Sequence, residues 1–98
     1  MNSASPGVIS LFLANSFYKT RAKYLVAISE AMEKEFNLIA NSGLNLQLDC
    51  PDLALSRHMI FSVLSNREFV KIANENMEIL NHSLRKIDPN MLRMHVCW

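Results

Sequence analysis

The sequence predicts an α/β fold in which strands and helices alternate along the chain in the order β-α-β-α-β. Two long segments carry apolar residues at helical spacing, and three short segments around them are rich in strand-forming residues. Alternation of this kind predicts parallel strands joined by right-handed crossovers. A chain of 98 residues has room for one small domain at most.

The first strand is expected over residues 8–13, a mostly apolar run that follows the turn signal Pro6-Gly7. Such a run suits a strand that is buried on both faces. The next segment is predicted to be an amphipathic helix, with Thr20 as its N-cap and Gly43 as its C-cap. Its apolar stripe consists of Leu25, Ile28, Met32, Phe36 and Ile39.

The second strand is expected over residues 44–49, because apolar and polar residues alternate strictly there. Leu44, Leu46 and Leu48 share one face, and Asn45, Gln47 and Asp49 share the other. Pro51 then prevents further regular strand pairing. The connection over residues 50–64 is longer than usual, and long loops are often functional, which draws attention to Asp52, Arg57 and His58. A short helical turn within this connection is the alternative.

The second helix is predicted to begin at a capping box, with Ser65 as N-cap and Glu68 reaching back to it. Asp88-Pro89 marks the exit of the chain from this helical region, and residues 91–98 form the expected third strand. The apolar face of the helix is formed by Phe69, Ile72, Ala73, Met77, Leu80 and Leu84. In the third strand Leu92, Met94, Val96 and Trp98 share one face, and Met91, Arg93, His95 and Cys97 share the other.

Two architectures fit this order of elements: an incomplete TIM (β/α)8 barrel, and an open parallel α/β sheet. In a barrel the outer face of each strand packs on helices, and inward residues at the carboxyl ends of the strands form the active site. An open doubly wound sheet also carries its sites at the carboxyl ends of strands, but it buries both strand faces. The polar series Asn45, Gln47, Asp49 therefore favours a barrel, with Asp49, His95 and Cys97 at its rim.

Composition narrows the classes of partner and the compartment. The formal charge is +1 and the basic residues are scattered along the chain, so neither nucleic acid nor an acidic membrane is an expected partner. The first residues lack the pattern of a signal peptide, and no apolar run approaches the length of a membrane span. Two cysteines in such a chain indicate a reducing compartment, and the expected location is cytoplasmic.

His95 and Cys97 are the residues with the most distinctive chemistry. They are two positions apart in an expected strand, so their side chains project to the same side. An imidazole and a thiolate on one face are half of a zinc site, which needs three or four protein ligands. A lone pair of this kind is more often structural than metal-binding, because free cysteine is commonly buried as a small hydrophobic residue.

Several segments together resemble a known family. Residues 46–54, Leu-Gln-Leu-Asp-Cys-Pro-Asp-Leu-Ala, resemble the "IQIDEPAL" strand end of cobalamin-independent methionine synthase. They are still more similar to the short homologues of the C-terminal catalytic domain of that enzyme, a group that includes alkyl-thiol transferases. His95-x-Cys97 resembles the zinc-binding H-x-C of these proteins, and residues 5–7 and 56–58 also fit the short homologues.

The resemblance implies that residues 1–98 are a single partial domain, a piece of a methionine synthase C-terminal-like TIM barrel. It implies that the intact parent is a zinc-dependent S-methyltransferase or alkyl transferase acting on a thiol such as homocysteine, as in methionine biosynthesis. His95 and Cys97 are then metal ligands, and Asp49 is a substrate-binding residue that holds the amino group. The remaining zinc ligands are expected outside this chain, and the isolated piece is expected to be inactive.

Two departures from the family pattern concern the alkyl donor. Cys50 stands where the methionine synthases have glutamate, and Leu55 stands where they have an acidic residue that contacts the folate. The resemblance therefore does not extend to methyltetrahydrofolate, and a different alkyl donor is expected. Cys50 is expected to be inert rather than a ligand.

The alternative to an enzyme is a non-catalytic βαβ module, either a truncated relict or a piece that serves binding and assembly. A complete barrel of the TIM type needs about 250 residues. Three strands alone leave open sheet edges, and open edges pair with other chains. The chain is therefore expected to self-associate through its exposed strand edges.

Overall fold

The computed structural model describes residues 1–97 as a small α/β unit built on a three-stranded parallel sheet. The strands β1 (Asn2–Ala4), β2 (Leu46–Asp49) and β3 (Leu92–His95) lie in sequential order, with β2 in the centre. Both pairings are parallel, which confirms the strand direction predicted from the sequence. Over the described residues the sheet is open, and the barrel stays a prediction.

The two long helices agree closely with their predicted positions. Helix α2 (Arg21–Asn41) begins after Thr20, whose side chain accepts a hydrogen bond from the backbone N–H of Lys23. It ends just before Gly43, which has the positive φ of 82° that favours glycine at a helix end. Helix α4 (Asn66–Leu84) begins at the predicted capping box, in which both reciprocal hydrogen bonds are present.

The prediction of a strand over residues 8–13 is wrong, because these residues form helix α1 (Pro6–Phe12). The Ser5 hydroxyl accepts a hydrogen bond from the N–H of Val8, and Pro6 occupies the first turn, where its missing N–H costs nothing. A short apolar run cannot by itself distinguish a strand from a buried helix. The first strand lies upstream, in the short polar segment β1.

The connection after β2 contains two short helical pieces, so the alternative of a helical turn is confirmed. A 3-10 turn, η1 (Pro51–Leu53), leads into the short helix α3 (Leu55–His58). A second 3-10 turn, η2 (Pro89–Met91), precedes β3. Strands β2 and β3 are also shorter than predicted: β2 begins at Leu46, and β3 ends at His95. The last predicted strand residue, Trp98, lies outside the described residues.

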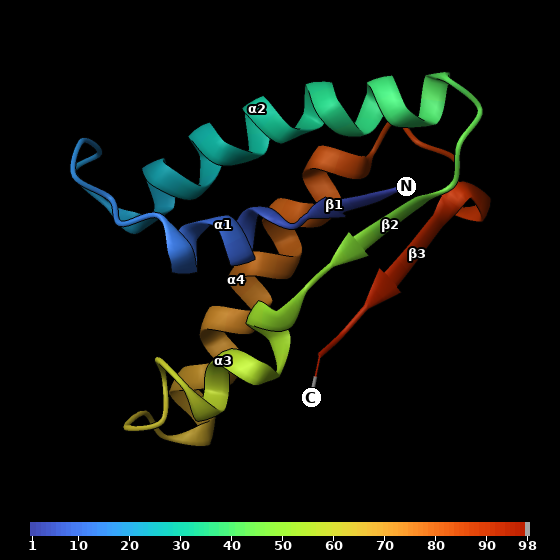
Figure 1. Cartoon of the computed structure of the whole chain (residues 1–98). Coiled ribbons are helices and arrows are strands. Elements are labelled where there is room, and N and C mark those ends of the chain that lie inside the picture. The colour runs from blue at the N-terminus through green and yellow to red at the C-terminus, as the bar shows by residue number, and fades with distance from the viewer. Residues whose placement is uncertain (98) are drawn as a thin grey trace.

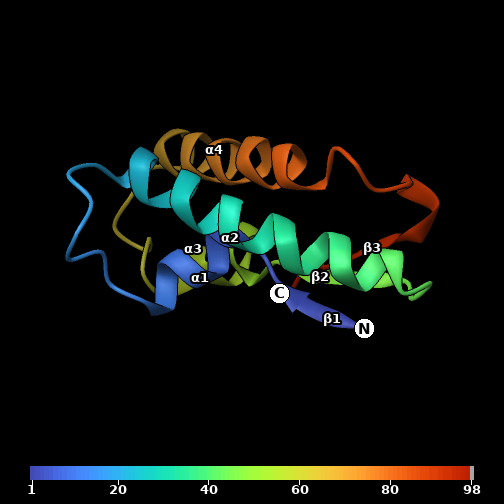
Figure 2. The same ribbon diagram turned by 90° about the horizontal axis from the view of Figure 1, so that it is seen from above.

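Helices α2 and α4 pack together over one face of the sheet (Figures 1 and 2). Leu46 and Leu48 point from the central strand into this layer and are almost fully buried. No helix within residues 1–97 combines the length and the apolar character that crossing a membrane requires. The core is formed by Phe36, Ile39, Leu46, Leu48, Cys50, Leu80, Leu84 and Ile87.

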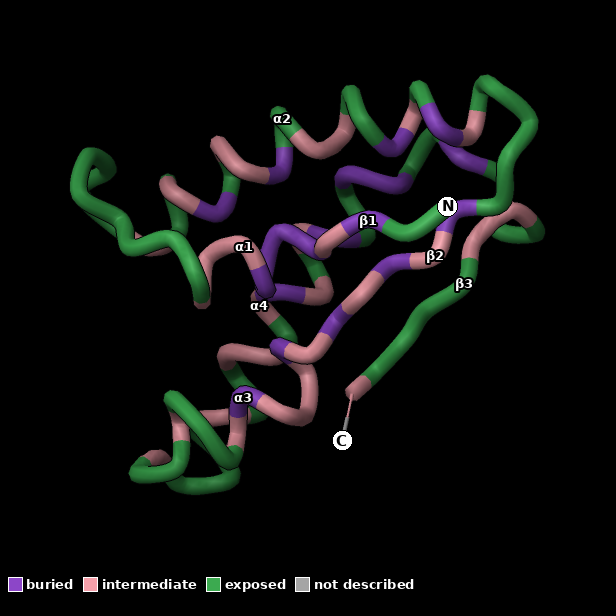
Figure 3. Tube along the Cα trace, viewed as in Figure 1, coloured by how far each residue is buried: buried purple, intermediate pink, exposed green. Residues whose placement is uncertain are grey.

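The opposite face of the sheet is not covered by any helix of the described chain (Figures 1 and 2). Burial alternates along β2, so that Gln47 and Asp49 are only half-buried on this second face. Most of β3 is exposed (Figure 3). The polar face predicted for the second and third strands is therefore the uncovered face of the sheet, as the alternation in sequence indicated.

Candidate functional site

Asp49 and His95 lie side by side at the carboxyl ends of neighbouring strands. The register of the β2–β3 pair matches Gln47 with Arg93 and Asp49 with His95. Paired residues in adjacent strands project to the same face, so both side chains are on the uncovered polar face. The structure thus brings together two of the three residues that the sequence analysis singled out, from segments that are far apart in the chain.

Cys97 is held near this pair by backbone hydrogen bonds from the loop after β2. The N–H of Cys50 donates to the carbonyl of His95 at 2.9 Å, and the N–H of Leu55 donates to the carbonyl of Cys97 at 3.1 Å. These bonds fix the chain after β3 alongside the segment that follows β2. Cys97 is half-buried and His95 is exposed, so the imidazole is accessible.

The carboxylate of Asp49 has little competition from other protein groups. The amide Nε2 of Gln47 donates to Oδ1 of Asp49 at 3.4 Å, which is a long hydrogen bond. An oxygen of this half-buried carboxylate can therefore accept hydrogen bonds from a bound ammonium group. This arrangement is compatible with the substrate role expected for Asp49.

The described residues do not supply a complete metal site. Within residues 1–97 there is no group of three His, Cys, Asp or Glu side chains arranged to hold one metal ion. His95 and Cys97 are donors of the types that zinc prefers, but zinc sites use three or four protein ligands. A zinc ion at this edge of the sheet would therefore need donors that residues 1–97 do not provide.

Cys50 belongs to the core and not to the candidate site. Its side chain is fully buried, and its Sγ lies 3.8 Å from the carbonyl oxygen of Leu48. Burial raises the pKa of the Cys50 thiol to about 11, with a smaller contribution from the charge of Asp52. A thiol that keeps its proton in a closed environment is neither a good nucleophile nor a good metal ligand. This supports the expectation that Cys50 is inert.

A buried polar cluster lies behind the strand ends, and the sequence analysis did not find it. The carboxylate of Asp52 is 2% exposed. Its Oδ1 accepts a hydrogen bond of 2.8 Å from the hydroxyl of Ser5, and its Oδ2 accepts one of 2.9 Å from Nδ2 of Asn76. The cluster therefore ties the start of α1, the turn after β2 and the middle of α4 together.

Arg21 extends this cluster to the start of α2. Its Nη2 donates to Oδ1 of Asn76 at 2.6 Å, and its Nη1 forms an ion pair of 3.0 Å with Glu75. Gly7 packs directly against the carboxylate of Asp52, where the structure leaves no room for a side chain. Every buried side-chain polar atom of the described residues has a hydrogen-bond partner, so this cluster is fully satisfied.

One sequence signal could have revealed the cluster. Asn76 falls on the apolar stripe of α4, three positions after Ala73 and four before Leu80, where a polar side chain needs a buried partner. The sequence draws attention to Asp52 only as a residue of a long loop, and to Ser5 only within residues 5–7, which fit the short homologues. Nothing in a single sequence indicates which of these distant residues meet.

Arg57 and His58 are the last two residues of α3. Arg57 donates to the carbonyl of Phe61 at 2.8 Å and to Oδ1 of Asn66 at 3.2 Å, and its guanidinium lies 5.9 Å from the ring centre of Phe69. These contacts hold the loop before α4, so Arg57 has a structural role in packing this loop. His58 is exposed.

Together these observations define a class: a small α/β protein with an aspartate, a histidine and a nearby cysteine at the carboxyl ends of two adjacent parallel strands. That edge of a parallel sheet is where such folds place their binding sites. Comparisons with protein-family models, with curated proteins and with solved structures find no match to this chain.

Proposed function

We propose that this chain is part of a zinc-dependent methyl or alkyl transferase that acts on a thiol, similar to cobalamin-independent methionine synthase. His95 and Cys97 are the two zinc ligands that it contributes, and Asp49 binds the amino group of a thiol amino acid such as homocysteine. The other ligands come from outside residues 1–97. When bound, zinc would favour the thiolate form of the acceptor, which is the nucleophilic form.

The register between β2 and β3 is the observation that carries this proposal. The resemblance rests on two separate motifs, residues 46–54 and His95-x-Cys97, and it requires them to meet. Asp49 and His95 are paired neighbours on one polar face. A carboxylate next to a metal-ligating pair is the arrangement that binding of an amino acid through both its ammonium and its thiol needs.

The placement of the helices supports a barrel as the setting. In a TIM barrel the helices cover only the outer face of the sheet, and the inner face carries the site. Here α2 and α4 both lie on the face of Leu46 and Leu48, and the polar face is left uncovered (Figure 2). The sequential strand order β1-β2-β3 is also the order of strands around a barrel.

Cobalt binding to the 98-residue chain tests the ligand assignment. Co²⁺ replaces Zn²⁺ in tetrahedral sites, and its bond to a thiolate gives an intense charge-transfer absorption band. We expect weak binding with such a band, lost in Cys97→Ser and reduced at least tenfold in affinity in His95→Ala. His82→Ala is the matched control, because His82 is an exposed histidine on α4. An equal band in all four proteins would overturn the assignment.

A second titration tests the role of Asp49. With Co²⁺ bound, homocysteine should strengthen the thiolate band, and Asp49→Asn should weaken this effect about tenfold while leaving the metal in place. An analogue of homocysteine that lacks the amino group should strengthen the band equally in the unaltered chain and in Asp49→Asn. If Asp49→Asn weakens both thiols to the same degree, Asp49 does not bind the amino group. If neither thiol reaches the metal, the interpretation as a non-catalytic module is preferred.

A further inference from the structure

Two loops that are distant in sequence lie at the same end of the molecule. Residues 13–20 connect α1 to α2, and residues 59–65 connect α3 to α4. Both loops protrude at the left of Figure 1 and again at the left of the perpendicular view in Figure 2. We call the surface formed by residues 12–20 and 59–65 the loop end.

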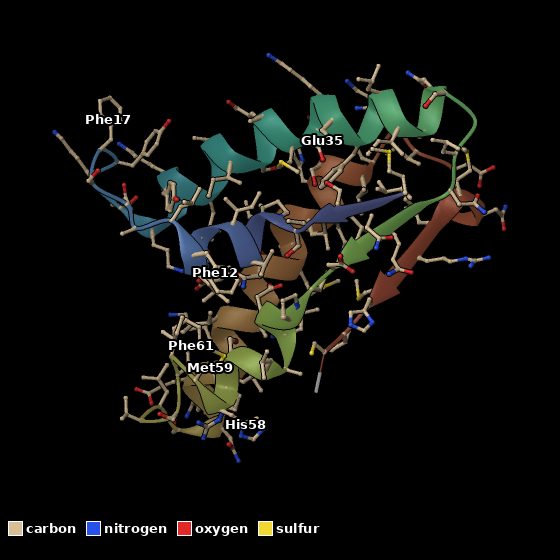
Figure 4. All side chains as sticks on the ribbon, viewed as in Figure 1. Phe12, Phe17, Glu35, His58, Met59 and Phe61 are labelled. Atoms are coloured by element: carbon tan, nitrogen blue, oxygen red, sulfur yellow. The ribbon has the colours of Figure 1, made fainter. Side chains whose placement is uncertain are left out.

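The loop end exposes an unusual number of large apolar side chains. Phe17 is 85% exposed and Val63 is 90% exposed, at the tips of the two loops. Figure 4 shows Phe17 projecting from the first loop, Met59 beside the second, and Phe12 between them. The large apolar residues exposed here are Phe12, Leu13, Phe17, Tyr18, Met59, Ile60 and Val63. Exposed apolar groups on this scale mark interaction surfaces.

Positive charge gathers around the same loops. Residues 12–23 contain Lys19, Arg21 and Lys23 and no acidic residue, and residues 55–67 contain Arg57 and Arg67 and no acidic residue. Two acidic groups near these segments are engaged in other contacts: Glu75 pairs with Arg21, and Glu68 caps α4 through Ser65. Glu30 lines a hollow on α2 together with Tyr18 and Lys23. The overall charge of +1 conceals this local excess of positive charge.

The loop end borders hollows of very different size. Tyr18 lines an open hollow of about 430 Å³ along α2, together with Lys23 and Glu30. A cavity of only about 20 Å³ lies between α1 and α3, lined by residues that include Phe12 and Met59. This is about the space of one water molecule. The apolar groups are instead carried on protruding loop tips, which insert into a soft layer more readily than they fill a groove on a rigid partner.

We propose that the loop end docks on an anionic lipid surface. Phe17 and Val63 enter the boundary between head groups and acyl chains, and Lys19, Lys23 and Arg67 lie at the level of the lipid phosphates. Surfaces that combine apolar insertion with basic residues bind membranes in this way, and each basic residue near the surface contributes about fivefold in affinity. The proposal uses none of the residues of the candidate zinc site, so it stands independently of the proposed function.

Vesicle co-sedimentation tests this proposal with the full chain. The probes are vesicles of phosphatidylcholine alone and vesicles of equal parts phosphatidylcholine and phosphatidylglycerol. We expect binding to the anionic vesicles at least tenfold tighter than to the neutral ones, and weaker binding as salt is raised. Lys19→Glu should reduce the affinity for anionic vesicles by tenfold or more, because it replaces an attractive charge with a repulsive one.

The apolar contribution is tested with the double variant Phe17→Ser and Val63→Ser. Both side chains are almost fully exposed, so the fold should be retained, which circular dichroism checks. We expect at least a tenfold loss of affinity for anionic vesicles. Leu38→Ser is the matched control, since Leu38 is 72% exposed on α2, away from both loops, and its loss should leave vesicle binding unchanged.

Three results would overturn the proposal. The first is no binding to anionic vesicles, and the second is equal binding to both kinds of vesicle. The third is equal binding by the double variant and by the unaltered chain. Sedimentation velocity without lipid tests the main competing occupant, a second copy of the chain. That occupant is indicated if the unaltered chain forms dimers, the double variant stays monomeric, and neither protein binds vesicles.

Discussion

Gly7 offers the sharpest test of how the strand ends are held. Gly7→Ala would place a methyl group 2.7 Å from Nδ2 of Asn76 and 2.8 Å from Cγ of Asp52, in overlap with the Asp52 carboxylate itself. Neither neighbour can retreat freely, because both side chains are buried and hydrogen-bonded to each other. We therefore expect the carboxylate to be displaced from its partners.

The magnitude follows from the contacts that are lost. A glycine in a helix normally gains about 0.5–1 kcal/mol of stability when it is replaced by alanine. Against this, Asp52 accepts two side-chain hydrogen bonds, from Ser5 and Asn76. Hydrogen bonds to a charged group contribute about 1.5–3 kcal/mol each. We expect Gly7→Ala to lower the free energy of unfolding by about 3 kcal/mol, a large share of the roughly 5–15 kcal/mol typical of a domain.

Urea unfolding followed by far-ultraviolet circular dichroism measures this change, provided that the dependence of the free energy on urea concentration stays constant. Gly43→Ala is the matched control. Gly43 has a φ of 82° but no atom within 4 Å of an added methyl group, so only backbone strain of about 1 kcal/mol is expected. Both substitutions add one methyl group, so a loss at position 7 well above that at position 43 reports the overlap with Asp52.

A double-mutant cycle with Asp52→Ala completes the test. Asp52→Ala removes the group that an alanine at position 7 would strike, so the combined loss should be smaller than the sum of the single losses by at least about 1 kcal/mol. The reasoning is refuted if Gly7→Ala leaves the chain as stable as before or more stable. It is also refuted if the two substitutions are additive.

Three further predictions concern the core and the helix ends. The pKa of Cys50 is raised to about 11 from an ordinary value of 9.0, so the unfolded chain loses this proton first. Below pH 9 the thiol of Cys50 is protonated in both the folded and the unfolded chain, so the free energy of unfolding does not depend on it. Between pH 9 and 11 the free energy of unfolding should fall by about 1 kcal/mol per pH unit. Cys50→Ala should lack this part of the slope, and equal slopes would contradict the assignment. Ser65→Ala removes the capping box of α4 and should cost about 1 kcal/mol in urea unfolding, whereas Ser62→Ala in the preceding loop should cost almost nothing. Phe36→Ala leaves a cavity in the centre of the core and should lower the free energy of unfolding by about 3–5 kcal/mol. Leu38→Ala, on the exposed side of α2, should lower it by less than about 0.5 kcal/mol. Similar losses for the two variants would place Phe36 outside the core.

The long helices and the central strand could be predicted because their signals are local. Thr20 and Ser65 cap their helices through hydrogen bonds that span three residues, and the alternation of β2 is visible within six residues. The polar face that carries Asp49 and His95 followed from the same alternation. Local hydrogen bonding and side-chain period are properties that a single sequence contains.

The first strand and the buried cluster could not be predicted because their causes are not local. β1 has three residues and little apolar character, and it is a strand because its backbone pairs with β2. Its Ser3 hydroxyl donates to Glu35 on α2, a partner that the spacing does not indicate. The apolar run at residues 8–13 was the stronger local signal, yet Ser5 and Pro6 directed it into a helix. The pairing of β1 with β2 is a tertiary effect, whereas the cap of α1 is a local signal that the apolar run concealed.

The parallel sheet has a consequence for how the chain acquires its structure. Asn2 pairs with Gln47, and Leu46 pairs with Leu92, so every strand pairing joins residues almost half the chain apart. Closing such large loops is entropically costly, and contacts of this kind slow folding. The helices can form early and locally, whereas the sheet has to wait for them. On the ribosome β3 cannot dock until residues 92–95 have emerged, long after β2 has been made. The central strand therefore keeps an unpaired edge during that interval, and an unpaired edge favours aggregation.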